Sequence, residues 1–207
     1  MHTPYVARSH HQNGVSLIVV LILMSALFLI AAFGARLSFL GEKSSRNDRD
    51  RQIAFQAAEA ALGDAEIDLM GPNAATNSRV CATSSKQVPL FVDGCGNTDA
   101  TRGLCTNATN QPLYKSIDFE ETGNSRRYVK LGEYTGGRQA GFATDSSALP
   151  AQMPRYIIEA FPYTRPRSGA SNATEYAFLI TSLGYGLNQK TQVMLQSVVY
   201  KPDVPGC

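Results

Sequence analysis

The sequence of 207 residues predicts an α+β protein, in which one long N-terminal helix packs on a C-terminal antiparallel β-sheet. Three observations carry this prediction. Residues 15–35 form an uncharged apolar segment, no proline occurs between Pro4 and Pro72, and strand-like runs fill the last quarter of the chain. A half-apolar helix and a half-apolar sheet each need a partner to bury their apolar faces, so we expect them to pack together.

The apolar segment VSLIVVLILMSALFLIAAFGA (15–35) contains no charged side chain. A helix needs about 20 apolar residues to cross a bilayer, whereas the apolar core of a secretory signal is shorter and ends at a cleavage site. Residues 15–35 are therefore expected to span a membrane. Gly34 and Gly41 each cost a helix about 1 kcal/mol relative to alanine. They indicate either a bend or close packing against another helix, and the sequence does not choose between the two.

The helix is expected to continue from the apolar segment to Met70, because Gly71-Pro72 is the first strong stop signal. Beyond Arg36 the pattern becomes amphipathic, with apolar residues three or four apart. One expected face contains Ile53, Ala57, Ala60, Ala61 and Asp64, and another contains Phe55, Ala58, Leu62, Ala65 and Leu69. Faces rich in alanine allow another element to approach closely.

The charges that flank the apolar segment leave its orientation open. Basic residues are more numerous after the segment than before it, which by the positive-inside rule would favour a cytoplasmic C-terminal side. Long domains cross the membrane largely regardless of charge, and the cysteines suggest an oxidising compartment. We therefore expect residues 71–207 to form a periplasmic domain.

The C-terminal region contains five strand-like runs separated by Gly, Pro, Asn and Ser residues. They are residues 87–92, 126–134, 155–163, 175–186 and 191–200. The last two are joined by the short segment LNQKT, which suits an antiparallel hairpin. An antiparallel sheet of about four strands is expected, while residues 72–125 are too irregular for strands to be assigned.

Four cysteines suggest that this domain is stapled by disulfides. They allow three pairings, and the sequence alone does not choose among them. Cys95 and Cys105 enclose a compact loop, so their pairing is favoured, and it would leave Cys81 to pair with Cys207.

Several classes of function find no support in the composition. The 19 basic and 17 acidic side chains nearly balance, so no nucleic-acid partner is indicated, and all three histidines lie in the first eleven residues. The short motif GYG (184–186) is expected to be a turn. Glu120, Glu121 and Glu133 suggest a solvated sheet edge, and DGCGNTD (93–99) lacks the spacing of an EF-hand. We predict no catalytic residue, no metal site and no cofactor.

Three stretches resemble the type IV pilin superfamily and, more narrowly, the PilX group of minor pilins. A short polar leader ends in Gly14 before the uncharged helix, DRDRQIAFQAAEAALGDAE (48–66) follows the helix, and QVMLQSVVY closes the sheet. The resemblance implies a type IV pilin-like fold and a class III leader at residues 1–14. It also implies that prepilin peptidase cleaves between Gly14 and Val15, and that Val15 is then N-methylated.

The sequence departs from the usual pilin pattern at two positions. Val15 stands where the mature chain usually begins with phenylalanine, and Val19 stands where pilins usually carry a glutamate. In the family, that buried carboxylate meets the amino terminus of a neighbouring subunit during docking, and its burial in lipid is costly unless it is paired. A subunit without it is best tolerated at the tip of the filament. The alternative is that Val19 is simply a lipid-facing residue of an ordinary anchor.

The resemblance also implies a location and partners. The protein would be a single-pass inner-membrane protein that assembles with other minor pilins and the major pilin at the pilus tip, possible partners there including a PilY-type adhesin. One alternative is a K-like minor pseudopilin of a type II secretion or DNA-uptake system. Another, from a different class, is a membrane-anchored periplasmic enzyme or ligand-binding protein.

Overall fold

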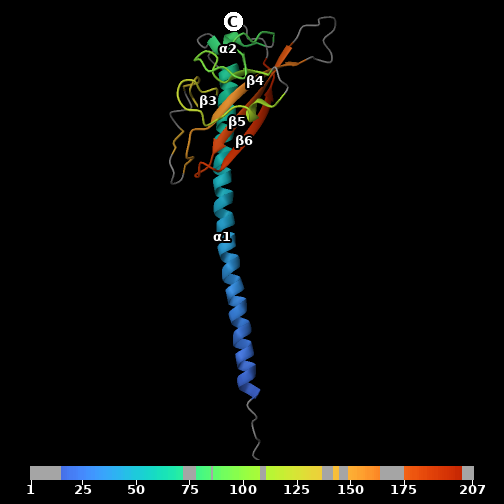
Figure 1. Cartoon of the computed structure of the whole chain (residues 1–207), viewed down its shortest axis with the longest axis vertical. Helices are drawn as coiled ribbons and strands as arrows, with labels where there is room; N and C mark the ends of the chain where they lie inside the picture. Colours follow the sequence, from blue (N-terminus) through green and yellow to red (C-terminus); the bar gives the residue numbers. More distant parts are fainter. Residues whose placement is uncertain are drawn as a thin grey trace, which may run out of the picture. The chain divides into compact units, whose positions relative to one another are not determined.

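The computed structural model describes residues 15–71, 78–84, 86–107, 111–136, 142–144, 149–163 and 175–201. The chain divides into two compact units, residues 1–47 and residues 48–207, which are described separately. Helix α1 (Val15–Met70) contributes to both (Figure 1). Its 56 residues correspond to a length of about 84 Å.

In the first unit, α1 presents its apolar side chains to the surroundings. Leu17, Phe28 and Leu40 are 68%, 75% and 64% exposed. Among the described residues, α1 is the one helix that is long and apolar enough to cross a membrane, judged by length and composition. The helix continues through Gly34 and Gly41, and a Cβ atom added at either glycine would meet nothing within 4 Å.

The second unit contains the end of α1, the short helix α2 and a six-stranded sheet. Its elements are α2 (Ser78–Ala82), β1 (Val92–Asp93), β2 (Leu104–Thr106), the 3-10 turn η1 (Leu113–Lys115), β3 (Val129–Lys130), β4 (Arg155–Tyr163), β5 (Glu175–Tyr185) and β6 (Gln192–Val199). The strand order is β1-β2-β4-β5-β6, and β3 pairs with the start of β4.

The α+β class is confirmed, and the sheet is mixed where the sequence predicts an antiparallel one. The pairs β4–β5 and β5–β6 are antiparallel, as the hairpin pattern predicts, but β1–β2 and β2–β4 are parallel. Where the sequence predicts strands at 87–92 and 126–134, the structure has the two-residue strands β1 (92–93) and β3 (129–130). Segments of two or three residues are too short to show a period, so the sequence carries no signal for β2.

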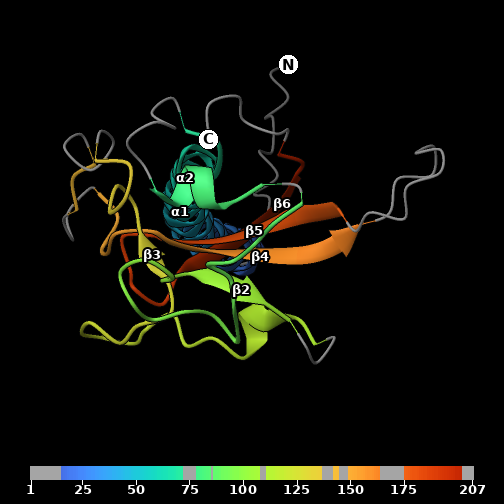
Figure 2. The same cartoon turned by 90° about the horizontal axis from the view of Figure 1, so that it is seen from above.

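The central strands β4 and β5 are covered on both faces of the sheet (Figure 2). On one face, Ala61, Ala65 and Leu69 of α1 pack on β4 and β5 through Tyr156 and Phe178. On the other face, the irregular segment that carries β2 and η1 buries a second core. That core contains Cys95, Cys105, Leu113, Ile117, Phe119, Tyr128, Ile157, Leu183 and Tyr185.

A single face of α1 is buried in this unit, where the sequence predicts two. Ala54, Ala57, Ala58 and Ala61 are at most 1% exposed, whereas Phe55 is 43% exposed. The small side chains let the backbone of β5 come close. A Cβ atom added at Gly184 would lie 2.9 Å from the Cα atom of Ala58 and would also overlap the Ala54 carbonyl oxygen. The predicted GYG turn is therefore wrong, because Gly184 and Tyr185 belong to β5.

Candidate assembly site

The N-terminal residues that the sequence singles out lie at the start of α1. Val15 is the first residue of the helix, and Gly14 lies outside the described residues. Val19 is helical and 49% exposed. From Val15 onward the first acidic residue is Glu42, and its carboxylate lies 2.5 Å from the guanidinium of Arg46, four residues further on. No carboxylate on this helix therefore stands within reach of the fifth position.

Three aspartates of α1 bind other parts of the second unit, and the first of them, the partly exposed Asp50, holds the β5–β6 turn. Oδ1 of Asp50 accepts hydrogen bonds from the backbone N–H groups of Leu187 and Asn188, the second at 3.3 Å. Oδ2 of Asp50 accepts a hydrogen bond from the Thr191 hydroxyl at 2.5 Å. This one carboxylate joins the helix to the tip of the hairpin.

The second aspartate, Asp64, is fully buried and binds the loop that follows β3. It accepts a hydrogen bond from the backbone N–H of Gly132 at 2.7 Å and another from the hydroxyl of Thr135. Buried carboxylates are tolerated when such donors satisfy them. The sequence places Asp64 on an amphipathic face, but it gives no sign that the carboxylate is buried and bonded.

The third aspartate, Asp68, forms a buried ion pair with Arg79 of α2. Their nearest atoms lie 2.8 Å apart, and the two side chains are 1% and 4% exposed. Asp68 also accepts a hydrogen bond from the Tyr156 hydroxyl at 3.0 Å. Burial raises the pKa of Asp68, and the nearby Arg79 guanidinium counteracts this effect. Arg79 further donates to the carbonyl oxygen of Arg102 and lies over the Tyr134 ring.

Lys201, the last described residue, also binds helix α2. Its ammonium group donates a hydrogen bond to the carbonyl oxygen of Val80 at 2.5 Å, and the residue is 2% exposed. Burial lowers the pKa of Lys201 to about 8, against a smaller opposing effect of Asp68. Helix α2 is thus attached to α1 through Arg79 and to the end of the sheet through Lys201.

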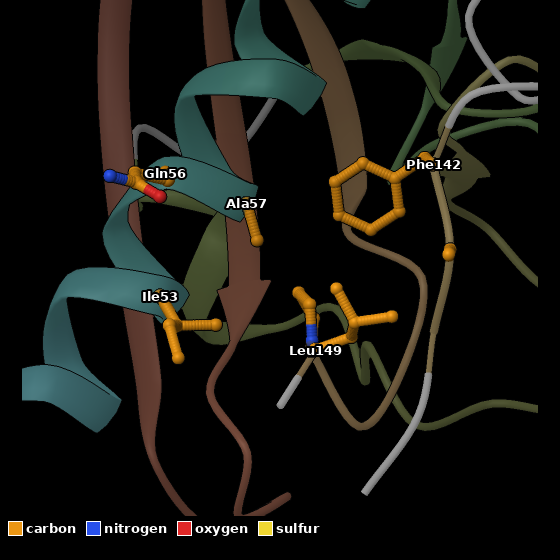
Figure 3. A pocket seen from close by; sticks show the side chains of 7 residues that line it. Ile53, Gln56, Ala57, Phe142 and Leu149 are labelled. Carbon is orange, nitrogen blue, oxygen red and sulfur yellow. The ribbon is translucent and has the colours of Figure 1, made fainter. Parts of the chain in front are cut away.

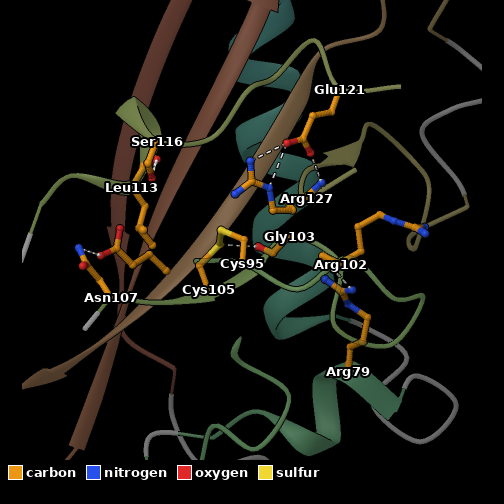
Figure 4. The surroundings of a disulfide bond; sticks show 11 residues. Arg79, Cys95, Arg102, Gly103, Cys105, Asn107, Leu113, Ser116, Glu121 and Arg127 are labelled. Atoms are coloured by element: carbon orange, nitrogen blue, oxygen red, sulfur yellow. Dashed lines mark hydrogen bonds and ion pairs between the residues drawn. A yellow bond between two sulfur atoms is a disulfide. The ribbon is translucent and has the colours of Figure 1, made fainter. Parts of the chain in front are cut away.

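On the opposite face of the sheet, a disulfide joins Cys95 and Cys105 (Figure 4). This pairing is the one that the compact loop favours. No cysteine among the described residues is free, and Cys81 lies in α2. Cys207 lies outside the described residues, so the pairing of Cys81 with Cys207 stays a prediction.

The acids of this layer bind arginines and tyrosines, so the predicted solvated edge is wrong for most of them. Glu133 lies 2.5 Å from Arg126 and 2.8 Å from Arg102. Burial alone would raise the pKa of Glu133, but hydrogen bonds, first from Arg126, lower it. Glu120 accepts a hydrogen bond from the Tyr185 hydroxyl at 2.6 Å. These contacts hold the layer together, and Glu120, whose side chain is 50% exposed, is the one of the three predicted edge acids that stays solvated.

The described residues were also compared with the requirements of a ligand pocket and of a metal site. A pocket of about 230 Å³ lies between α1 and the segments around Phe142 and Leu149 (Figure 3), and its lining includes Ile53, Gln56 and Ala57. Within the described ranges, no group of three or more His, Cys, Asp or Glu side chains could hold a metal ion.

A long apolar N-terminal helix whose second half packs on a sheet defines the class of type IV pilin-like proteins. Two family models match the chain. The model described as PilX N-terminal matches residues 13–62, and the model described as type IV pilus assembly protein PilX C-term matches residues 101–201. The chain belongs to the PilX family of type IV pilus minor pilins. No curated protein and no solved structure matched it.

The C-terminal model covers most of the sheet and one of the three stretches that resemble the family, QVMLQSVVY. It includes β2 to β6, Arg102 and Glu133. The motif DRDRQIAFQAAEAALGDAE carries Asp50, Ala54 and Asp64, and the N-terminal model matches it up to residue 62, two residues before Asp64. These residues contact β5, the β5–β6 turn and the loop after β3, which explains why the motif combines acids with alanines.

Proposed function

We propose that this minor pilin acts in the assembly and initiation of a type IV pilus, as part of a minor-pilin complex at the filament tip. The observation that carries the proposal is Val19. A pilin uses a carboxylate at this position to receive the amino terminus of a neighbour, and the segment from Val15 to Gly41 contains no carboxylate at all. A subunit of this kind fits the end of a filament better than its shaft.

The proposal includes a maturation route and a location. Prepilin peptidase would cleave between Gly14 and Val15, and Val15 would then be N-methylated. Residues 15–35 would hold the chain in the inner membrane, with residues 71–207 in the periplasm before assembly. Partners would be other minor pilins, the major pilin and a PilY-type tip adhesin. Mass spectrometry of the mature chain tests the route, since it would find an N-methylated Val15, and an intact Met1 would contradict it.

The tip position is tested by substituting the fifth residue of the mature chain. Immunogold labelling should place the wild-type protein at filament ends, and deletion should abolish surface piliation and twitching. Val19→Glu should add label along the shaft, because the new carboxylate can receive a neighbour's amino terminus. Val20→Glu is the matched control, since it adds the same charge to the apolar segment at a position that does not receive the terminus.

Three outcomes would count against the tip position. They are label along the shaft in the wild type, shaft label that Val20→Glu produces as well as Val19→Glu, and normal piliation in the deletion strain. The first two would show that Val19 does not determine where the subunit lies in the filament. The third would show that the protein is not needed to initiate a pilus.

A further inference from the structure

The two edges of the sheet differ in the features that prevent strand pairing. The edge strand β1 has only two residues, one of them Asp93, and the disulfide of Cys95 follows at once. The other edge strand, β6, has eight residues with the sequence QVMLQSVV and no charge. Natural sheets protect an edge with charges, prolines, bulges or a short strand. By these criteria β1 is protected and β6 is not.

One side of β6 pairs with β5, and no strand among the described residues pairs with its other side. Within the described ranges, the row of backbone N–H and C=O groups on that side of β6 therefore has no strand partner. At about 3.4 Å per residue, this row is about 27 Å long. That length suits the addition of a complete strand.

The face of β6 that shares its side of the sheet with the disulfide layer is also incompletely covered. Met194 is paired with Leu183, and the two side chains lie on the same face. Leu183 is 5% exposed beneath the layer, whereas Met194 is 37% exposed and Val198 is 48% exposed. The layer covers β5 and ends before β6, which leaves Met194 and Val198 exposed on this face, with Gln196 between them.

We propose that β6 receives an extended, uncharged segment of a different polypeptide, which adds a strand to the sheet. Backbone hydrogen bonds would hold the added strand, and its apolar side chains would cover Met194 and Val198. The absence of charge along β6 favours an uncharged partner, because a charged side chain at this interface would be desolvated without a counter-ion. This interface does not depend on the tip position proposed above.

A second copy of this chain, paired antiparallel through β6, fits less well. The two copies would be related by a two-fold axis normal to the sheet, which would point their Asp48–Met70 helix segments in opposite directions. Subunits of one filament instead run the same way.

Site-specific crosslinking in the full-length chain, in cells that assemble pili, tests the proposal. The photoreactive residue p-benzoylphenylalanine replaces Met194, Gln196 and Val198, one at a time, and the crosslinked peptides are mapped by mass spectrometry. We expect links to one segment of a different protein, moving by about two partner residues for each two residues along β6, as a strand ladder requires. Links only to this chain or its copies, links without that progression, or no links would overturn the proposal.

A pair of matched substitutions separates pairing from general surface effects. With the crosslinker at position 194, Val198→Lys should lower the crosslink yield about tenfold, because a charge on an edge opposes pairing. Val92→Lys is the control on the β1 edge, where the valine is 41% exposed, and it should leave the yield unchanged. Gln196→Lys serves as a second variant if Val198→Lys unfolds. Equal yields in all folded variants would contradict the proposal.

Discussion

The two parts of α1 differ in what stabilises them, although they form one helix. From Leu17 to Leu40 the large apolar side chains are exposed, and the described residues of that unit include nothing else to cover them. From Asp50 to Leu69 the helix instead buries alanines and two aspartates, Asp64 and Asp68, within its own domain. The first part thus needs lipid or other subunits, whereas the second part is stabilised by its own domain. Substitutions in the two parts should therefore have different effects.

The largest effect is expected at Asp68. Replacing Asp68 by alanine leaves the Arg79 guanidinium buried at 4% exposure without its partner, and losing one member of a buried pair costs about 3 to 5 kcal/mol. Denaturant unfolding of the full-length protein in detergent measures this loss. Asp48→Ala removes an exposed carboxylate from the same helix and should change the free energy of unfolding by less than about 0.5 kcal/mol. Equal effects of the two variants would show that the ion pair does not stabilise the domain.

A smaller loss of the free energy of unfolding is expected when a methyl group is inserted between α1 and β5. Gly184→Ala places a Cβ atom against the backbone of Ala54 and Ala58, and overpacking of this kind costs about 1 to 3 kcal/mol. The same unfolding measurement applies. A Gly184→Ala protein as stable as the wild type would mean that the helix and the strand can move apart freely.

Lys201 should make the stability of the second unit depend on pH. Its pKa of about 8 in the folded chain lies below the usual 10.5, so between these values the unfolded chain holds a proton that the folded chain has released. The free energy of unfolding should therefore rise with pH, by about 1 to 2 kcal/mol from pH 8 to pH 10. In Lys201→Met this contribution should disappear. The raised pKa values of Tyr156 and Tyr185 act in the opposite sense above pH 10, where the comparison should stop.

The smallest effect on stability is expected in the first part of α1, where the substitution should stabilise the helix. Gly41→Ala adds a Cβ atom that meets nothing within 4 Å, so it should stabilise the helix by about 0.5 to 1 kcal/mol. Amide hydrogen exchange of residues 36–47 should slow about two- to fivefold, while the unfolding of the second unit stays unchanged. Faster exchange would indicate that Gly41 has a packing role that an alanine disturbs.

The sequence predicts the elements that have a repeating residue pattern or a clear stop signal. It does not predict the elements that depend on single contacts between distant residues. The long helix, β4, the β5–β6 hairpin and the Cys95–Cys105 pair all follow from periodicity, stop signals and loop length. Strand β2 and the parallel pairings do not, because three residues show no period. The contacts of the aspartates on α1 cannot be predicted for another reason. Asp50 and Asp68 look like ordinary helix-surface acids until the chain brings Thr191 and Arg79 to them.

The contacts of Asp50 also constrain the order of folding. Thr191, which binds its carboxylate, lies 141 residues further along the chain, and Tyr156, which binds Asp68, lies 88 residues beyond that aspartate. The helix is made first, yet Asp68 acquires Tyr156 only when β4 has been made, and Asp50 acquires Thr191 only when the β5–β6 turn has been made. Contacts so distant in sequence form slowly, because a long loop must close before any bond rewards it. During that interval the nascent domain keeps a hydrated, incomplete helix face, which closes only when the β5–β6 turn reaches Asp50.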